Sequence, residues 1–96
     1  MTFKDLDFKT CNTLKGVWAR VDFDNGFSAS IISNDVSYGG KSGLYEIAVL
    51  KGDNIISTTD VTNDVVGWLD DNDVTRTLNA ISKLDKDGVL PKDVLL

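Results

Sequence analysis

"GVWARVDFDNGFSASIIS", residues 16–33, is the stretch that decides the fold of this chain. Apolar and polar residues alternate along its first half, which is typical of a half-buried β-strand, and the Asn-Gly pair at its centre indicates a hairpin. A two-residue loop would set Val21 opposite Ser30 and mix the two faces. A three-residue loop, 24–26, closed by a left-handed glycine, sets Val21 opposite Ala29 and keeps the apolar residues together. We predict the three-residue loop, because a one-residue slip would invert a whole strand.

Strand patterns continue after this hairpin. "SGLYEIAVLKG", residues 42–52, predicts a third strand, and its orientation follows from Glu46, a charged side chain that belongs on the solvent side. Tyr45, Ile47 and Val49 then point inward. The segments around this strand are expected to be a longer loop at 33–43, a turn at 51–54 and a fourth strand at 55–59.

Helical spacing replaces strand alternation from residue 62 onward. "TNDVVGWL", residues 62–69, predicts a short helix capped by Thr62. A longer helix follows, with Asp70 at the cap position, Asp73 three residues later, and Gly88 expected to end it. Its apolar face, expected to pack on the sheet, consists of Val74, Leu78, Ile81 and Leu84.

Together these segments predict an α+β fold in a single domain, residues 1–96. The sheet is expected to have four antiparallel strands in a hairpin meander. A short and a longer C-terminal helix are expected to pack on one of its faces.

The negative charge is concentrated in one part of the chain. The net charge is −5, and residues 52–75 contain six aspartates with no lysine or arginine. These aspartates are Asp53, Asp60, Asp64, Asp70, Asp71 and Asp73. An acidic surface repels nucleic-acid phosphates and attracts basic protein surfaces, so we predict a protein partner with a basic surface and no direct nucleic-acid contact. The alternative interpretation is structural, since carboxylates at a helix start oppose the positive end of the helix dipole.

The inventory of side chains argues against most catalytic and metal chemistry. The chain has no histidine and one cysteine, Cys11, which removes the usual zinc sites, Ser/His/Asp triads and Cys/His dyads. The acidic fragments lack the spacing of a calcium loop, and Gly-Gly-Lys-Ser at 39–42 lacks the context of a phosphate-binding loop. We therefore expect a protein that is not an enzyme and has no catalytic residue, metal site or cofactor.

Hydropathy and the start of the chain bear on location. No apolar run approaches the roughly 20 residues that span a bilayer. Residues 1–8 alternate charged and apolar side chains, unlike a secretory signal. We therefore expect no membrane contact and a cytoplasmic protein, in agreement with a single unpaired cysteine.

A second candidate surface is the outward face of the sheet. By strand alternation it carries Trp18 and Leu44, with further apolar residues at 32, 48 and 50, which is more than a bare solvated face should carry. Cover by the two ends of the chain is the simplest explanation. The alternative is a contact with a partner or with a second copy of the chain.

Three segments of the chain contain features that occur in this order in other proteins. They are "DFDNGFSASII" at 22–32, "GLYEIAVLKGDNIISTTDVTNDVVGWL" at 43–69 and "DDNDVTRTLNAISKL" at 70–84. The features are an Asn-Gly hairpin, a Tyr-Glu-Ile-Ala-Val-Leu strand, and a Thr-x-Asp-Val turn before a terminal helix. In this order they resemble small acidic proteins of unassigned function that bacteriophages and prophages encode. The likeness covers residues 16–84.

The resemblance implies a protein that binds and blocks a host protein inside a bacterium. CRISPR effectors and restriction enzymes, whose nucleic-acid channels are basic, are the typical targets. The expected function is thus a stoichiometric inhibitor of anti-CRISPR or anti-restriction type, with the six aspartates, Trp18 and Leu44 as its contact residues. Two alternatives stay open. One is a phage structural or assembly protein that self-associates through the outer sheet face, and the other is a binder of a small signalling ligand near Tyr38, Gly39 and Lys41.

Overall fold

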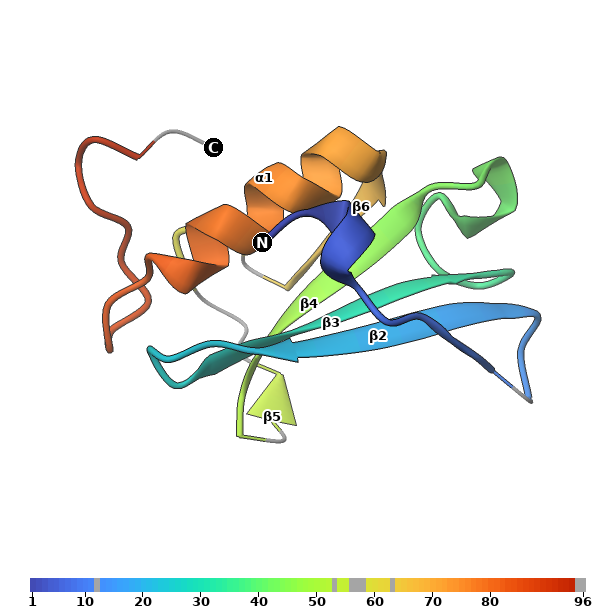
Figure 1. Ribbon diagram of the computed structural model, residues 1–96, viewed down its shortest axis with the longest axis horizontal. Helices are drawn as coiled ribbons and strands as arrows, with labels where there is room; N and C mark the ends of the chain where they lie inside the picture. Colours follow the sequence, from blue (N-terminus) through green and yellow to red (C-terminus); the bar gives the residue numbers. More distant parts are fainter. Residues whose placement is uncertain (12, 53, 56–58, 63, 95–96) are drawn as a thin grey trace.

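The protein has two layers, an antiparallel β-sheet and a helix that covers one of its faces (Figure 1). The computed structural model describes residues 1–11, 13–52, 54–55, 59–62 and 64–94. The elements are η1 (Phe3–Asp5), β1 (Lys9–Thr10), β2 (Gly16–Asp22), β3 (Phe27–Asn34), η2 (Gly40–Ser42), β4 (Tyr45–Lys51), β5 (Asn54–Ile55), β6 (Val65–Leu69) and α1 (Asp71–Ser82). In this part of the chain six strands form one sheet in the order β1-β2-β3-β4-β5, and β6 also pairs with β4. The predicted α+β class is confirmed.

The hairpin of β2 and β3 has the predicted register. Val21 pairs with Ala29, as the three-residue loop requires. The Phe23 amide donates to the Phe27 carbonyl at 2.9 Å, and Gly26 has a φ of 88°. This left-handed conformation is one that glycine adopts without steric cost, so Gly26 closes the turn and the following bulge.

Strand β4 extends the same inner face. Ile47 pairs with Ile31, and Glu46 on the opposite face pairs with Ile32. The orientation predicted from the single glutamate is therefore confirmed. Ile31, Ile47 and Val49 have no exposed surface and form the centre of the core beneath α1.

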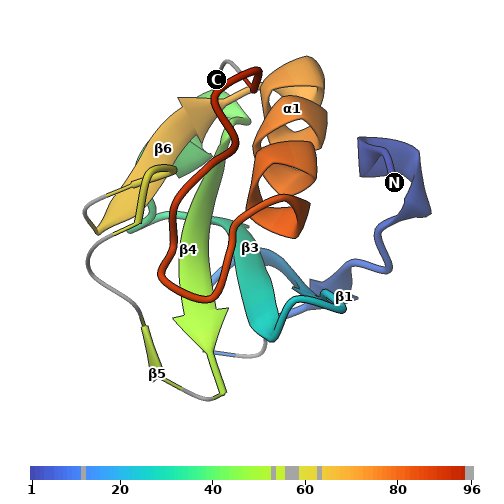
Figure 2. The ribbon, with the colours of Figure 1, turned by 90° about the vertical axis from the view of Figure 1, so that its left-hand side faces the viewer.

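The edges of the sheet differ from the four-stranded prediction. On one side, β1 adds to β2. On the other, β4 is paired by two short strands, β5 near its C-terminal end and β6 along its N-terminal half (Figure 2). The strand expected at 55–59 is observed only as Asn54–Ile55, and residues 56–58 lie outside the described residues.

The prediction of a short helix at 62–69 is wrong, because Val65–Leu69 is strand β6. Thr62 Oγ1 does accept a hydrogen bond from the Asp64 amide at 3.1 Å, the kind of local bond that a helix cap makes. The chain then extends. Val65 and Val66 are β-branched and favour a strand, and pairing with β4 satisfies backbone groups that its edge would leave open.

Helix α1 begins as predicted. The Asp70 carboxylate accepts a hydrogen bond from the Asp73 amide at 2.8 Å, and the Asp73 carboxylate accepts one from the Asp70 amide at 3.1 Å. This reciprocal pair is a capping box, which satisfies two backbone donors at the helix start. Asp71 lies in the same first turn, where its charge opposes the helix dipole.

The apolar face of α1 packs on the sheet as predicted. Val74, Leu78 and Ile81 have no exposed surface, and burial of each such side chain stabilises a fold by about 1.5–3 kcal/mol. The helix ends at Ser82, so the expectation that Gly88 ends it is wrong. Gly88 lies in a later turn, with its φ at 77°.

The β2–β3 loop holds the C-terminal end of α1. Asn25 Nδ2 donates to the carbonyls of Ile81 and Leu84 at 2.8 and 3.1 Å. Its Oδ1 accepts from the Phe27 amide at 3.0 Å. The last carbonyls of a helix lack partners within the helix, so one side chain in the hairpin loop both shapes the turn and caps the helix.

Both ends of the described chain lie on the helix side of the sheet (Figure 1). The rings of Phe3 and Phe8 lie 5.1 and 5.4 Å from that of Tyr45, on the inner face. The Phe3 amide donates to Thr75 Oγ1 on α1 at 2.8 Å. Leu90 packs against the same core. For the described residues, the expectation that the chain ends cover the outer sheet face is therefore wrong.

Candidate functional site

The structure divides the acidic stretch between the two ends of α1. At the N-terminal end lie Asp70, Asp71 and Asp73. Asp60 lies at the other end, where its amide donates to the Gly88 carbonyl at 2.8 Å and its carboxylate accepts from the Leu90 amide at 2.8 Å. The helix has 12 residues and is therefore about 18 Å long. Among the described residues, the predicted acidic contacts therefore do not form one continuous surface.

Asp64 and Asp53 complete the predicted acidic set. Asp64 is exposed and immediately precedes β6. Five strand residues, at about 3.3 Å each, separate it from the start of α1. Asp53 lies outside the described residues. The carboxylates that the structure brings together are Asp70, Asp71 and Asp73, which we name the helix-start cluster.

Two carboxylates of the helix-start cluster have structural partners. Asp70 and Asp73 form the capping box, and Asp73 is also ion-paired with Arg76. The hydrogen bond from the Asp70 amide, followed by the Arg76 charge, holds the pKa of Asp73 below its ordinary value. Asp71 is exposed, and within the described residues its carboxylate makes no hydrogen bond or ion pair. The pKa of Tyr45 is raised by burial of its ring and, second, by the Asp71 charge.

The carboxylates with resolved pKa shifts, Asp73 and Asp22, are both shifted downward. For Asp22 the largest cause is a hydrogen bond from the Ser28 hydroxyl at 2.6 Å, and the second is one from Arg20. A general acid near neutral pH needs the opposite, a raised carboxyl pKa. Both groups stay ionised, which suits a negative surface.

The outer face of the sheet contains the other two predicted contacts, in different surroundings. Trp18 is 40% exposed on β2. Leu44 is half buried beside Gly39, and its carbonyl accepts a hydrogen bond from Ser33 Oγ at 2.9 Å. Arg20 reaches across this face to the Gly52 carbonyl at 3.0 Å. Trp18 therefore offers more contact area to a partner than Leu44 does.

Two exposed aromatic residues, Trp68 and Tyr38, were not predicted as partner contacts. Trp68 on β6 is 62% exposed and Tyr38 in the β3–β4 loop is 60% exposed. The two flank a shallow pocket of about 220 Å³. Tyr38 was expected only near a small-ligand site, and Trp68 only as part of the short helix predicted at 62–69. The one local signal for the pair is Gly67, since a glycine inside a strand marks a bulge or a close approach of two backbones.

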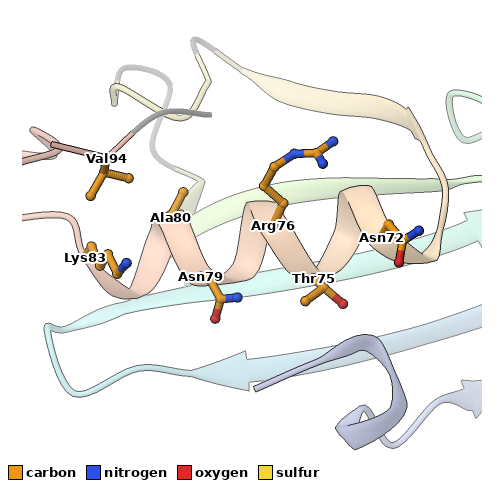
Figure 3. Close-up of a pocket in the computed structure, with 7 residues that line it drawn as sticks. All are labelled: Asn72, Thr75, Arg76, Asn79, Ala80, Lys83 and Val94. Carbon is orange, nitrogen blue, oxygen red and sulfur yellow. The ribbon is translucent and has the colours of Figure 1, made fainter.

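A hollow of about 300 Å³ lies along the solvent side of α1 (Figure 3). Asn72, Thr75, Arg76, Asn79, Ala80, Lys83 and Val94 line it. Its two charged side chains are Arg76 and Lys83, and Arg76 is paired with Asp73. The flank of α1 is therefore polar and basic, whereas its start is acidic.

Within the described residues, no group of three His, Cys, Asp or Glu side chains could hold a metal ion. The helices among these residues all fall short of the length and apolarity that a bilayer-spanning helix needs. Cys11 is half buried, and a hydrogen bond with the Thr13 hydroxyl at 3.5 Å is the largest cause that lowers its pKa. Comparisons with protein-family models, curated proteins and solved structures give no match to this chain.

Proposed function

We propose that this chain is a small protein-binding module, without enzymatic activity, that blocks a host protein by docking on its basic surface. The CRISPR effectors and restriction enzymes of a bacterial host are the proposed targets, and the host cytoplasm the proposed location. This follows the resemblance of residues 16–84 to proteins of phages and prophages. The proposal needs no cofactor, metal ion, nucleic acid or membrane.

The observation that carries the proposal is the charge at the start of α1. Asp70 and Asp71 are exposed there, and Asp73 stays ionised. Among the described residues, Arg76 pairs with Asp73, and Lys4 lines a hollow together with Asp71. Asp35, in the β3–β4 loop, lines the same pocket as Trp68. Trp68 precedes Asp70 by two residues, so this pocket lies near the start of α1. A negative surface of this kind speeds encounter with a basic groove and makes binding sensitive to salt.

Nuclease inhibition tests the proposal. Purified CRISPR effectors and restriction enzymes would be titrated with the chain while DNA cleavage is measured. We expect cleavage to stop at a fixed molar ratio, and the affinity to fall as salt rises. Full cleavage by every enzyme at a large molar excess of the chain would contradict the proposal.

The variants for this test must leave the capping box intact, because loss of binding could otherwise reflect loss of the helix. Asp35→Lys with Asp71→Lys reverses two exposed charges that take no part in the box. Asp87→Lys with Asp93→Lys makes the same change in net charge beyond the other end of α1. We expect the first pair to weaken inhibition at least about tenfold and the second to have a much smaller effect. Equal effects of the two pairs would show that net charge, and not this surface, matters.

Self-association through the outer sheet face is the second candidate. It is favoured by one observation, the 40% exposure of Trp18 on a face that the described chain ends leave uncovered. Light scattering at high protein concentration separates the two functions. A dimer that Trp18→Ala dissociates would favour self-association, and a monomer would exclude it.

A further inference from the structure

Trp68 combines two features that each cost stability. Its φ is 59°, the only positive value among the non-glycine residues that the structure describes. The left-handed region costs a bulky residue of this type on the order of 1–3 kcal/mol. The residue is also 62% exposed, so burial of the indole does not explain why a tryptophan stands here. Strain at an exposed aromatic residue suggests a function for the side chain.

The surrounding backbone holds this conformation through close contacts. The Trp68 amide donates to the Tyr38 carbonyl at 3.1 Å. A Cβ at Gly67 would collide with the Tyr38 side chain, and a Cβ at Gly39 would lie 3.0 Å from Trp68 Cα. The register of β6 on β4 shifts at this point, between Tyr45 and Ile47. The two glycines and the shift therefore press the β3–β4 loop against β6 and turn Trp68 outward.

The loop that presents Tyr38 is held in one shape by side-chain hydrogen bonds. Asn34 Oδ1 accepts from the amides of Val36 and Ser37, at 2.9 and 2.8 Å. The Tyr38 amide donates to Glu46 Oε1 at 3.0 Å. Aromatic side chains on a preorganised backbone lose little conformational entropy when they bind, which is why they dominate many interfaces.

The charges around the pair indicate what it would bind. Asp35 lines the pocket between the two rings, Glu46 holds the Tyr38 amide, and Asp70 follows Trp68 by two residues. Lys41 is the single base on that pocket. Carboxylates around exposed indole and phenol rings suit arginine, whose guanidinium stacks on aromatic faces and pairs with carboxylates.

We propose that Trp68 and Tyr38 form the anchor by which this chain docks on an arginine-rich protein surface, with an arginine of the partner stacked on the indole. The class of partner rests on the proposed function. Trp68 is then the energetic centre of the contact, since tryptophan and tyrosine are enriched at the positions that carry most binding energy. The helix-start cluster supplies the charged border beside it.

The experiment compares the two tryptophans of the chain, Trp68 and Trp18, against a nuclease that the wild-type protein inhibits. Trp68→Gly removes the indole and also the strain of the positive φ, so the melting temperature is expected to stay within about 4 °C. The affinity is expected to fall at least about 30-fold, and Trp18→Ala is expected to change it less than about threefold. Trp68→Asn, a residue that tolerates this backbone, repeats the test if the glycine variant fails to fold. If either Trp68 variant folds and its affinity stays within threefold of the wild type, the inference is overturned.

If no nuclease is inhibited, the proposed function fails and the anchor is tested separately. The probe is a synthetic arginine-rich peptide, and the reporter is tryptophan fluorescence. Trp18→Phe leaves Trp68 as the reporter, and Trp68→Gly leaves Trp18. The inference expects the peptide to change the emission of the first variant and to bind the second at least about tenfold more weakly. Unchanged emission from Trp68, or equal peptide affinity of the two variants, overturns it.

Discussion

The two ends of helix α1 are capped by groups of different origin. At the N-terminal end, both partners of the capping box, Asp70 and Asp73, lie three residues apart in the chain. At the C-terminal end, the capping amide belongs to Asn25, 56 residues before the Ile81 carbonyl it binds. The first cap can form whenever the helix forms. The second exists only after the hairpin and the helix have docked, so it depends on the tertiary fold.

Removal of the long-range cap should have the largest effect. Asn25→Ala removes hydrogen bonds to the Ile81 carbonyl in the last turn of α1 and to the Leu84 carbonyl just beyond it, and one from the Phe27 amide. The Ile81 carbonyl keeps the Leu84 amide as a donor, whereas the Leu84 carbonyl and the Phe27 amide lose their partner. Since a part-buried group left unpaired costs about 1–3 kcal/mol, we expect the free energy of unfolding in urea to fall by about 2–3 kcal/mol. Asp24→Ala, at the exposed neighbouring position, is the control and should stay within about 0.5 kcal/mol of the wild type. A smaller loss for Asn25→Ala than for Asp70→Ala would contradict the comparison.

Removal of the local cap should cost less. Asp70→Ala deletes the acceptor for the Asp73 amide, and substitutions of this kind cost about 1 kcal/mol. The measurement is the same urea titration, followed by circular dichroism. Asp64→Ala removes an exposed aspartate from the same acidic stretch without touching a cap, and little change is expected. If the two variants were equally destabilised, net charge would explain the loss better than capping does.

The smallest effect should come from acid, and only at the N-terminal end. The folded-state pKa of Asp73 is lowered, mainly by the Asp70 amide hydrogen bond, so its contribution to stability is complete above the unfolded value of about 3.9. It is lost as the pH falls through the lower folded value, where the unfolded chain binds more protons. We expect the stability advantage of the wild type over Asp73→Asn to shrink between pH 5 and pH 2 in urea titrations.

The other cap provides the contrast for this pH series. An amide does not titrate, so the difference between the wild type and Asn25→Ala should stay constant over the same range. A difference that shrank equally for both variants would place the acid sensitivity outside the helix start. Asp22, whose pKa is also lowered, loses its contribution in the same window, but it is unchanged in both variants and cancels in each comparison.

The elements that were predicted correctly depend on contacts close in the chain. The β2–β3 register followed from the residues next to the loop, and the start of α1 followed from Asp70 and Asp73. Strand β6 was missed because Val65 and Leu69, four residues apart, fit one face of a helix or of a strand. Its state was decided by the open edge of β4, which local periodicity does not reveal.

The candidate site was predicted less well than the fold. The acidic stretch looked continuous in the sequence, but β6 and α1 turn the chain back and separate Asp60 from the helix start. Trp68 was not predicted as a contact residue. Its exposure depends on the close approach of Tyr38 to Gly67, which the local sequence does not show. That approach joins segments about 30 residues apart.

Local sequence was enough to predict the hairpin register, the start of α1 and the apolar face that α1 buries, because alternation, turn chemistry and capping act over a few residues. Three features depend instead on contacts between distant segments: the strand state of Val65–Leu69, the Asn25 cap and the outward position of Trp68. Each of these depends on unpaired backbone groups, at a sheet edge or a helix end, meeting a partner from a distant segment. These backbone groups find their partners only when the sheet and the helix pack together, so the local sequence does not show which distant segment will pair with them.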